Sequence, residues 1–174
     1  INLIEFSADS AEELKASMQP LLEILNSDTS VSHAYTIAWG DDVKKIWGMR
    51  KKAVGLLGNT QGEARPMAFV EDTAVPPEHL ADFIVEFRAL LDSHNLQYGM
   101  FGHVDAGVLH VRPILDMKAP NDEKLVRTIT DQVVELTHKY GGLLWGEHGK
   151  GVRSEFSPKF FGCLLTHLTL PTNA

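Results

Sequence analysis

Cysteine is almost absent from this chain: Cys163 is the only one among 174 residues. A single thiol forms neither an internal disulfide nor a zinc or iron–sulfur site built from several cysteines, so the sequence favours a reducing, cytosolic setting. Apolar runs of the ~20 residues that a membrane-spanning helix needs are also missing. Basic residues are in deficit, 16 against 23 acidic ones. The resulting charge of −7 argues against a nucleic-acid surface, because binding to phosphates requires cationic side chains.

Common catalytic and nucleotide-binding motifs are missing as well. No G-x-G-x-x-G follows an expected strand, and no P-loop sequence occurs, which disfavours a doubly wound nucleotide fold. The G-x-S-x-G turn of serine hydrolases is absent, and Cys163 lacks a basic neighbour that would activate it as a nucleophile. What is present is an ordinary globular composition, 44% hydrophobic and 22% charged, at a length typical of one domain.

The two ends of the sequence suggest a segment of a larger protein. The chain begins without Met and without a basic leader, on residues that read as a strand. Residues 162–174 lack any helical or strand period. We expect one domain over residues 1–161, followed by a frayed or non-native tail over residues 162–174.

Hydrophobic periodicity and capping residues predict alternating strands and helices. The clearest amphipathic stripe follows Pro76-Pro77-Glu78, and Pro20 predicts a kink in, or a shortening of, the first helix. Strands are expected over Ile1–Phe6, Ala34–Trp39, Met67–Val70, Gln97–His103 and Val108–Pro113, and helices over Ala11–Leu25 and Asp41–Leu57, after Pro76, after Pro120 and, briefly, from Pro158. This order predicts an α+β fold: a ferredoxin-like antiparallel or mixed sheet with helices mainly on one face.

Histidines and a carboxylate form the main candidate site. His103 and His110 bracket the turn at Ala106-Gly107, so a hairpin would bring the two imidazoles together. Two imidazoles and one carboxylate are a common set of ligands for Zn²⁺, Mn²⁺ or Fe²⁺, and Glu147 lies in a glycine-rich loop that could supply the carboxylate. His148, beside it, could accept a substrate proton. Eight histidines in 174 residues also give such spacings by chance, so spacing alone leaves both interpretations open.

Arg50 is a second candidate, because arginine binds carboxylates through two parallel hydrogen bonds. Taken singly, it reads equally as a solvated residue on the surface of a helix.

Two motifs resemble those of a known family. The sequence Gly102-His103-Val104-Asp105-Ala106-Gly107-Val108-Leu109-His110 is similar to the pattern G-H-x-G-D-G-N-x-H, and Gly146-Glu147-His148-Gly149-Lys150-Gly151 matches G-E-H-G-x-G. Both are typical of the C-terminal domain of FAD-linked oxidases of the vanillyl-alcohol-oxidase type, which include D-lactate, glycolate and D-2-hydroxyglutarate dehydrogenases. Trp47-Gly48-Met49-Arg50 also resembles the family's W-x-x-R segment. The likeness is greatest to large bacterial members that add an iron–sulfur domain.

The resemblance implies roles for individual residues. His103, His110 and Glu147 would bind a divalent metal, His148 would take the substrate hydroxyl proton, and Arg50 would bind a substrate carboxylate. FAD would be held mainly by a domain of the same polypeptide that is outside this chain, and the substrate would be a small 2-hydroxy acid. The turn departs from the family pattern at Asp105, Ala106 and Val108.

The resemblance therefore predicts the substrate- and metal-binding cap of a flavin-dependent D-2-hydroxy-acid dehydrogenase, a fragment that is inactive by itself. It further implies an iron–sulfur cluster elsewhere in the full protein, and a cytoplasmic location or a peripheral one at the inner membrane through the electron acceptor. A homo-oligomer is left open. The alternative is a non-catalytic ferredoxin-like assembly module; a free-standing metal hydrolase suits the histidines less well.

Overall fold

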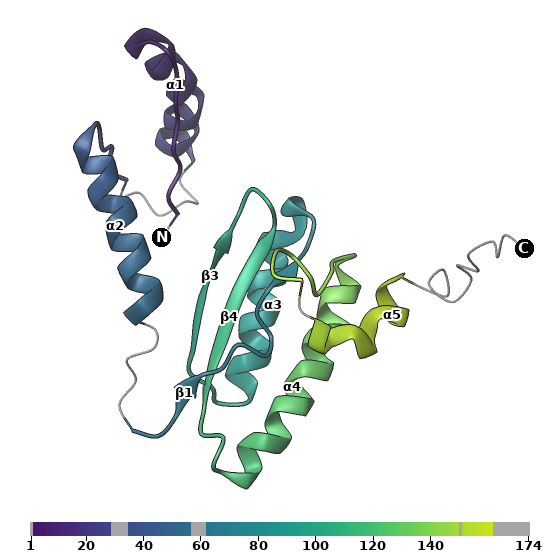
Figure 1. The fold of residues 1–174 in the computed structure, drawn as a ribbon. Coiled ribbons are helices and arrows are strands. Elements are labelled where there is room, and N and C mark those ends of the chain that lie inside the picture. Colours follow the sequence, from purple (N-terminus) through teal and green to yellow (C-terminus); the bar gives the residue numbers. More distant parts are fainter. Residues whose placement is uncertain (1, 29–34, 57–61, 150, 162–174) are drawn as a thin grey trace, which may run out of the picture. The chain divides into compact units, whose positions relative to one another are not determined.

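A computed structural model describes residues 2–28, 35–56, 62–149 and 151–161 (Figure 1). It divides the chain into two compact units, Ile1–Met49 and Arg50–Ala174, which are described separately. The predicted tail over residues 162–174, which includes Cys163, lies outside the described residues.

The first unit is helical. Helix α1 (Ala11–Ser27) begins at Ser10, whose side chain accepts a hydrogen bond from the backbone N–H of Glu13 at 3.2 Å and so satisfies one of the donors left open at a helix start. It continues past Pro20, so the predicted shortening is wrong. Helix α2 (Asp41–Leu56) starts in this unit with two aspartates in its first turn and ends in the second unit.

Two strands predicted here are wrong. Residues 2–6 and 35–39 form no strand, and Ile1 and Ala34 lie outside the described residues. These segments are rich in residues with high β-propensity, but that propensity reflects packing on a half-buried pleated surface. Ile4 is 62% exposed and Trp39 is 48% exposed, so neither segment has such a surface to pack on among the described residues.

The second unit contains a small antiparallel sheet with β4 (Val108–Leu115) at its centre. It pairs with β3 (Tyr98–His103) in the predicted hairpin, from Tyr98 opposite Pro113 to His103 opposite Val108. The short strands β1 (Arg65–Pro66) and β2 (Thr73–Ala74) also pair with β4. Gly107 closes the hairpin at a φ of +66°, and a Cβ there would lie 1.8 Å from the carbonyl oxygen of Val75, so only glycine fits.

The strand predicted over Met67–Val70 is displaced. These residues run between β1 and β2 without being part of a strand. Asp72 adopts a left-handed φ of 73°, which interrupts the pleat immediately before β2.

Two long helices cover one face of the sheet (Figure 1). The one-turn helix η1 (Pro77–His79) leads into α3 (Leu80–Ser93), and α4 (Pro120–Lys139) follows β4. The predicted stripe of α3 is buried through Leu80, Phe83, Phe87 and Leu91, which pack with Leu109 and Val111 of β4 and with Ile129 and Val133 of α4. Each such side chain contributes about 1.5–3 kcal/mol when buried, so this shared core fixes the helices to the sheet.

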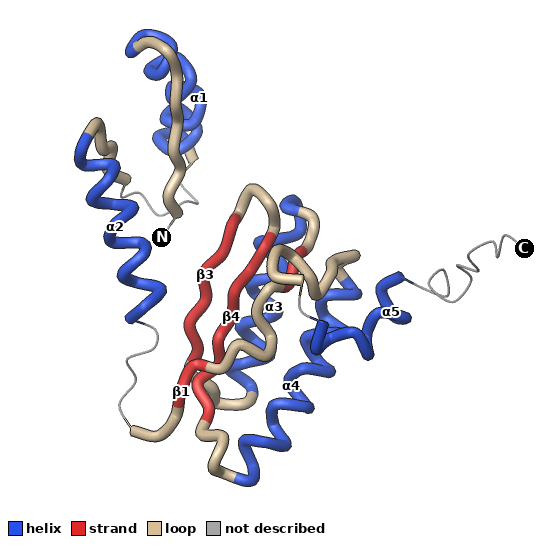
Figure 2. Tube along the Cα trace, in the orientation of Figure 1, coloured by secondary structure: helices blue, strands red, loops and turns tan. Residues whose placement is uncertain are grey.

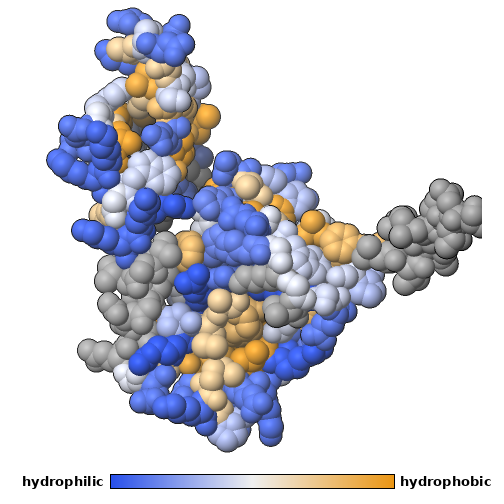
Figure 3. All heavy atoms as spheres, viewed as in Figure 1, coloured by the Kyte–Doolittle hydropathy of each residue, from blue (hydrophilic) through white to orange (hydrophobic). Residues whose placement is uncertain are grey.

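The predicted α+β class is confirmed, with an antiparallel sheet and its main helices on one face. The chain ends its described part in η2 (Gly151–Phe156) and α5 (Ser157–Phe161), close to the short helix predicted from Pro158. Hydrophilic and hydrophobic side chains alternate in small patches over the visible face of this unit (Figure 3). Of the helices described, none has the length and apolar character needed to cross a membrane.

Candidate functional site

The β3–β4 hairpin brings His103 and His110 together. Side chains alternate between the two faces of a sheet, and Leu109 and Val111 point into the core, so His110 points to the face that the long helices leave uncovered. The ring centroids of His103 and His110 lie 5.8 Å apart, edge to face. The hairpin prediction for this pair is confirmed in its geometry.

A loop after α4 carries Glu147 to the same face. Leu143 pairs with Ala74, and the backbone N–H of Gly146 donates to the carbonyl of Asp72 at 2.9 Å, so the loop runs beside the segment that precedes α3 (Figure 2). A Cβ on Gly146 would lie 3.1 Å from Oδ1 of Asp72 and 3.0 Å from Val108. Glycine therefore allows the close approach that positions the next residue.

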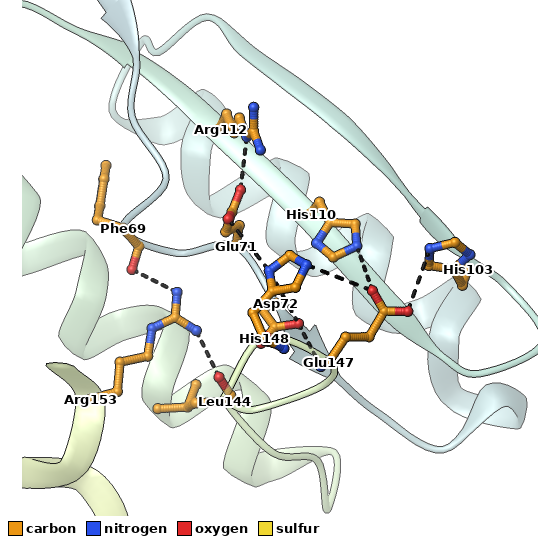
Figure 4. A network of polar contacts seen from close by, with 10 residues as sticks. All are labelled: Phe69, Glu71, Asp72, His103, His110, Arg112, Leu144, Glu147, His148 and Arg153. Atoms are coloured by element: carbon orange, nitrogen blue, oxygen red, sulfur yellow. Dashed lines mark hydrogen bonds and ion pairs between the residues drawn. The ribbon is translucent and has the colours of Figure 1, made fainter. Parts of the chain in front are cut away.

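The Glu147 carboxylate lies between the two imidazoles (Figure 4). Its Oε1 is 3.5 Å from Nε2 of His103, and its Oε2 is 3.3 Å from Nε2 of His110. Both separations exceed those of a good N–H···O hydrogen bond. Two donors held ~2.0–2.1 Å from one ion at a tetrahedral angle lie roughly 3.4 Å apart, so each of these two N–O separations has the size expected for a pair of donors that share an ion.

His148 completes the cluster from the same loop. Its ring stacks on His110 at a centroid separation of 4.9 Å and an interplanar angle of 14°. Its Nε2 is 3.9 Å from Oε2 of Glu147, whereas its Nδ1 faces Glu71 at 3.7 Å and Asp72 at 3.9 Å. The side chain is 41% exposed, so the ring is partly open to solvent.

Burial governs the charge of His110. The side chain is 5% exposed. Desolvation, followed by the nearby His148, lowers the pKa of His110, while Glu147, Glu71 and Asp72 act in the opposite direction. The resulting neutral imidazole is the form that binds metals. Its Nδ1 is buried and has no hydrogen-bond partner within the described part of the chain.

The sequence did not reveal four charged residues that surround these side chains. Glu71 and Asp72 are 4% and 0% exposed, and the Nε of Arg112 donates to Glu71 at 2.8 Å. Arg153, 5% exposed, donates to the carbonyls of Leu144 at 2.7 Å and of Phe69 at 3.1 Å. Two signals were available: Arg112 follows His110 by two positions on β4, which places both on one face, and adjacent acidic residues follow the apolar Phe69-Val70.

Ligand atoms of Asp72, His110, Glu147 and His148 all lie within 4.8 Å of one another. His103 reaches the cluster through its approach to Glu147 alone. The structure thus brings four predicted site residues together, His103, His110, Glu147 and His148. Arg50 lies on α2 at the boundary of the two units, and its role in binding a substrate carboxylate stays a prediction.

Comparison with known proteins identifies relatives over nearly the whole chain. The family model described as "FAD linked oxidases, C-terminal domain" matches residues 1–168. A D-2-hydroxyglutarate dehydrogenase of Pseudomonas putida is 60% identical over 164 residues, covering 93% of this chain and 16% of that protein. One from Escherichia coli is 58% identical over 167 residues, with the same two shares, 93% and 16%. A probable mitochondrial D-lactate dehydrogenase of Danio rerio is 27% identical over 139 residues, covering 78% of the chain and 28% of that protein.

Proposed function

Since this chain belongs to the family of FAD-linked oxidase C-terminal domains, we propose that it is the substrate- and metal-binding cap of a flavin-dependent D-2-hydroxy-acid dehydrogenase. The chain spans 16% of the length of the two D-2-hydroxyglutarate dehydrogenases compared above, so the proposed activity would belong to a longer polypeptide. The substrate class is a D-2-hydroxy acid of the D-2-hydroxyglutarate or D-lactate type, in keeping with the names of these relatives.

One observation carries the proposal: the Glu147 carboxylate lies between the Nε2 atoms of His103 and His110 at 3.5 and 3.3 Å. These three residues would hold a divalent ion, Zn²⁺, Mn²⁺ or Fe²⁺. Such an ion supplies Lewis acidity toward the hydroxyl and carboxylate oxygens of the substrate. His103 is 40% exposed, so the cluster is open to a small ligand from that side.

His148 is the proposed proton acceptor. Its Nε2 faces the side of Glu147, where a substrate hydroxyl would be presented, and its Nδ1 faces two buried carboxylates. With its proton on Nδ1, on the side of those carboxylates, the ring has the Nε2 lone pair available to accept the substrate proton. Arg50 is proposed to bind a substrate carboxylate. FAD, which a domain outside this chain would hold, would supply the acceptor for the hydride that leaves the substrate carbon.

The remaining expectations are part of the same proposal. The domain extends over residues 1–161, and its partner is the FAD-binding domain of the same polypeptide. An iron–sulfur cluster elsewhere in that polypeptide, a cytoplasmic or peripheral inner-membrane location and a homo-oligomeric state stay predictions.

The test uses the full-length parent protein with bound flavin. Flavin reduction is followed after mixing with D-2-hydroxyglutarate, with D-lactate and with the L-enantiomers, and metal content is measured by mass spectrometry. Glu147→Gln should lose both the metal and the reduction by the D-substrate. Glu155→Gln, which alters an exposed glutamate paired with Arg127, is the matched control and should retain both. A wild-type protein without metal, or one indifferent to all four acids, would contradict the proposal and favour the assembly module.

A further inference from the structure

Asp72 has three unusual properties at once. Its side chain is 0% exposed, that side chain carries a carboxyl group, and its backbone has a φ of 73°. Residues other than glycine are rare in this left-handed region, although Asp and Asn enter it more readily than most. Strain of this kind persists where surrounding contacts determine the conformation, often beside functional sites.

The contacts of Asp72 explain why a carboxylate occupies this position. Its Oδ1 accepts the backbone N–H of Glu147 at 2.8 Å, and its Oδ2 accepts the backbone N–H of His148 at 3.0 Å. Its own backbone N–H donates to Leu109 of β4 at 2.8 Å, and its carbonyl accepts from Gly146 at 2.9 Å. A single buried residue thus ties the start of the glycine loop to the strand that carries His110.

Both carboxylate oxygens of Asp72 already receive a backbone donor, and the side chain is fully buried. This arrangement differs from that of Glu147, whose two oxygens face imidazole nitrogens. Although Asp72 lies within the group of potential ligand atoms, its bonds suit a clamp that holds the loop.

We propose that Asp72 is a positioning residue that fixes Glu147 and His148 through their backbone N–H groups and thereby preorganises the metal site. This inference rests on the proposed function for its metal-binding part. Residues outside the ligand set that orient the ligands change metal affinity by about 10–100-fold when they are replaced.

Two substitutions distinguish the hydrogen bonds that the Asp72 carboxylate accepts from the effect of its left-handed backbone conformation. Asp72→Asn keeps the size and the left-handed backbone, but its amide nitrogen cannot accept, so one N–H loses its acceptor. Asp72→Gly removes both acceptors and adopts the left-handed φ without a steric penalty. Asp122→Asn is the matched control, because the Asp122 carboxylate accepts the backbone N–H of Asp116 at 2.8 Å beyond the far end of β4.

The first measurement is amide hydrogen exchange on the metal-free chain. Both Asp72 variants should speed exchange at Glu147 and His148 on the order of 10-fold, while the amides of α3 and α4 keep their protection. The control should leave Glu147 and His148 unchanged. Wild-type exchange rates at these two amides in both variants would overturn the clamp. Failure of both variants to fold would also overturn it, since Asp72 would then support the whole unit instead of the loop.

The second measurement is the affinity for Zn²⁺ alone, by calorimetric titration. Asp72→Asn should raise the Kd about 10–100-fold and Asp122→Asn should not change it. Absence of Zn²⁺ binding by the wild type contradicts the proposed function, and the exchange data still decide on the clamp. Equal affinity of wild type and Asp72→Asn refutes the inference and leaves the proposed function intact.

Discussion

Arg153 places a positive charge inside the second unit, where it is 5% exposed. Its guanidinium donates to the carbonyls of Leu144 and Phe69, so it joins the start of the glycine loop to the segment before Asp72 (Figure 4). Burial lowers the pKa of Arg153, and the charges of Asp72 and Glu71 oppose that shift. The arginine is therefore a buried counter-charge near two buried carboxylates, of which Glu71 is also paired with Arg112.

Arg153→Met tests this role, because it keeps an unbranched side chain and removes the charge. The two carbonyls lose charged donors, and the carboxylates of Asp72 and Glu71 lose one of the positive charges near them, while Arg112 stays paired with Glu71. Removing one partner of a buried set of charges costs about 3–5 kcal/mol, and we expect that loss in the free energy of unfolding, with a fall in Tm on the order of 10 °C. Arg153→Lys keeps the charge but loses the planar fork, so its cost should be about 1.5–3 kcal/mol.

Urea denaturation followed by circular dichroism measures these free energies on the metal-free chain. Arg127→Met is the matched control, since Arg127 is 60% exposed and its ion pairs with Asp131 and Glu155 lie at the surface. Such exposed ion pairs contribute about 0–1 kcal/mol to the free energy of unfolding. A loss below about 1 kcal/mol for Arg153→Met, or one equal to that of the control, would refute the assignment of Arg153 as a buried counter-charge.

Four further outcomes follow from the same structure. In the full-length protein, His148→Asn should lower kcat by about 10²–10⁴-fold with little change in KM, and near-normal kcat would reject it as the proton acceptor. Arg50→Lys should mainly raise KM for the hydroxy acid, and an unchanged KM would argue against carboxylate binding there. Phe83→Ala should cost about 3–5 kcal/mol of stability in urea melts, because the ring is 0% exposed between the helices and the sheet. In the folded chain the pKa of His110 lies below its ordinary value of 6.5, so near that pH the unfolded chain binds more protons at this residue than the folded chain does. The free energy of unfolding of the metal-free chain should therefore rise with pH up to about 6.5 and fall as the pH drops below that value. His110→Gln should make this pH dependence weaker in thermal melts recorded over a range of pH.

Local sequence determined much of the second unit. The stripe from Leu80 to Leu91 predicted α3, and the β-rich segments around Gly107 predicted the hairpin with His103 and His110 at one end. These signals succeed because a helix repeats every 3.6 residues and a hairpin needs only a short turn between two strands. Predictions over Ile1–Phe6 and Ala34–Trp39 failed because a strand exists only where a partner strand accepts its hydrogen bonds, and propensity does not report partners.

For the site, the sequence alone determined the types of candidate ligand: two histidines across a hairpin, and a Glu-His pair in a loop whose glycines allow close packing. Only the tertiary structure decided that the Glu147 carboxylate lies between both imidazoles, and that Asp72 and Arg153 are buried beneath the loop. Asp72 and Arg153 are 81 positions apart in the numbering, and nothing near either residue indicates the other. A charged side chain is buried in a protein only where an opposite charge or hydrogen-bond partners compensate it, and which residues serve as those partners depends on how segments distant in the sequence pack together.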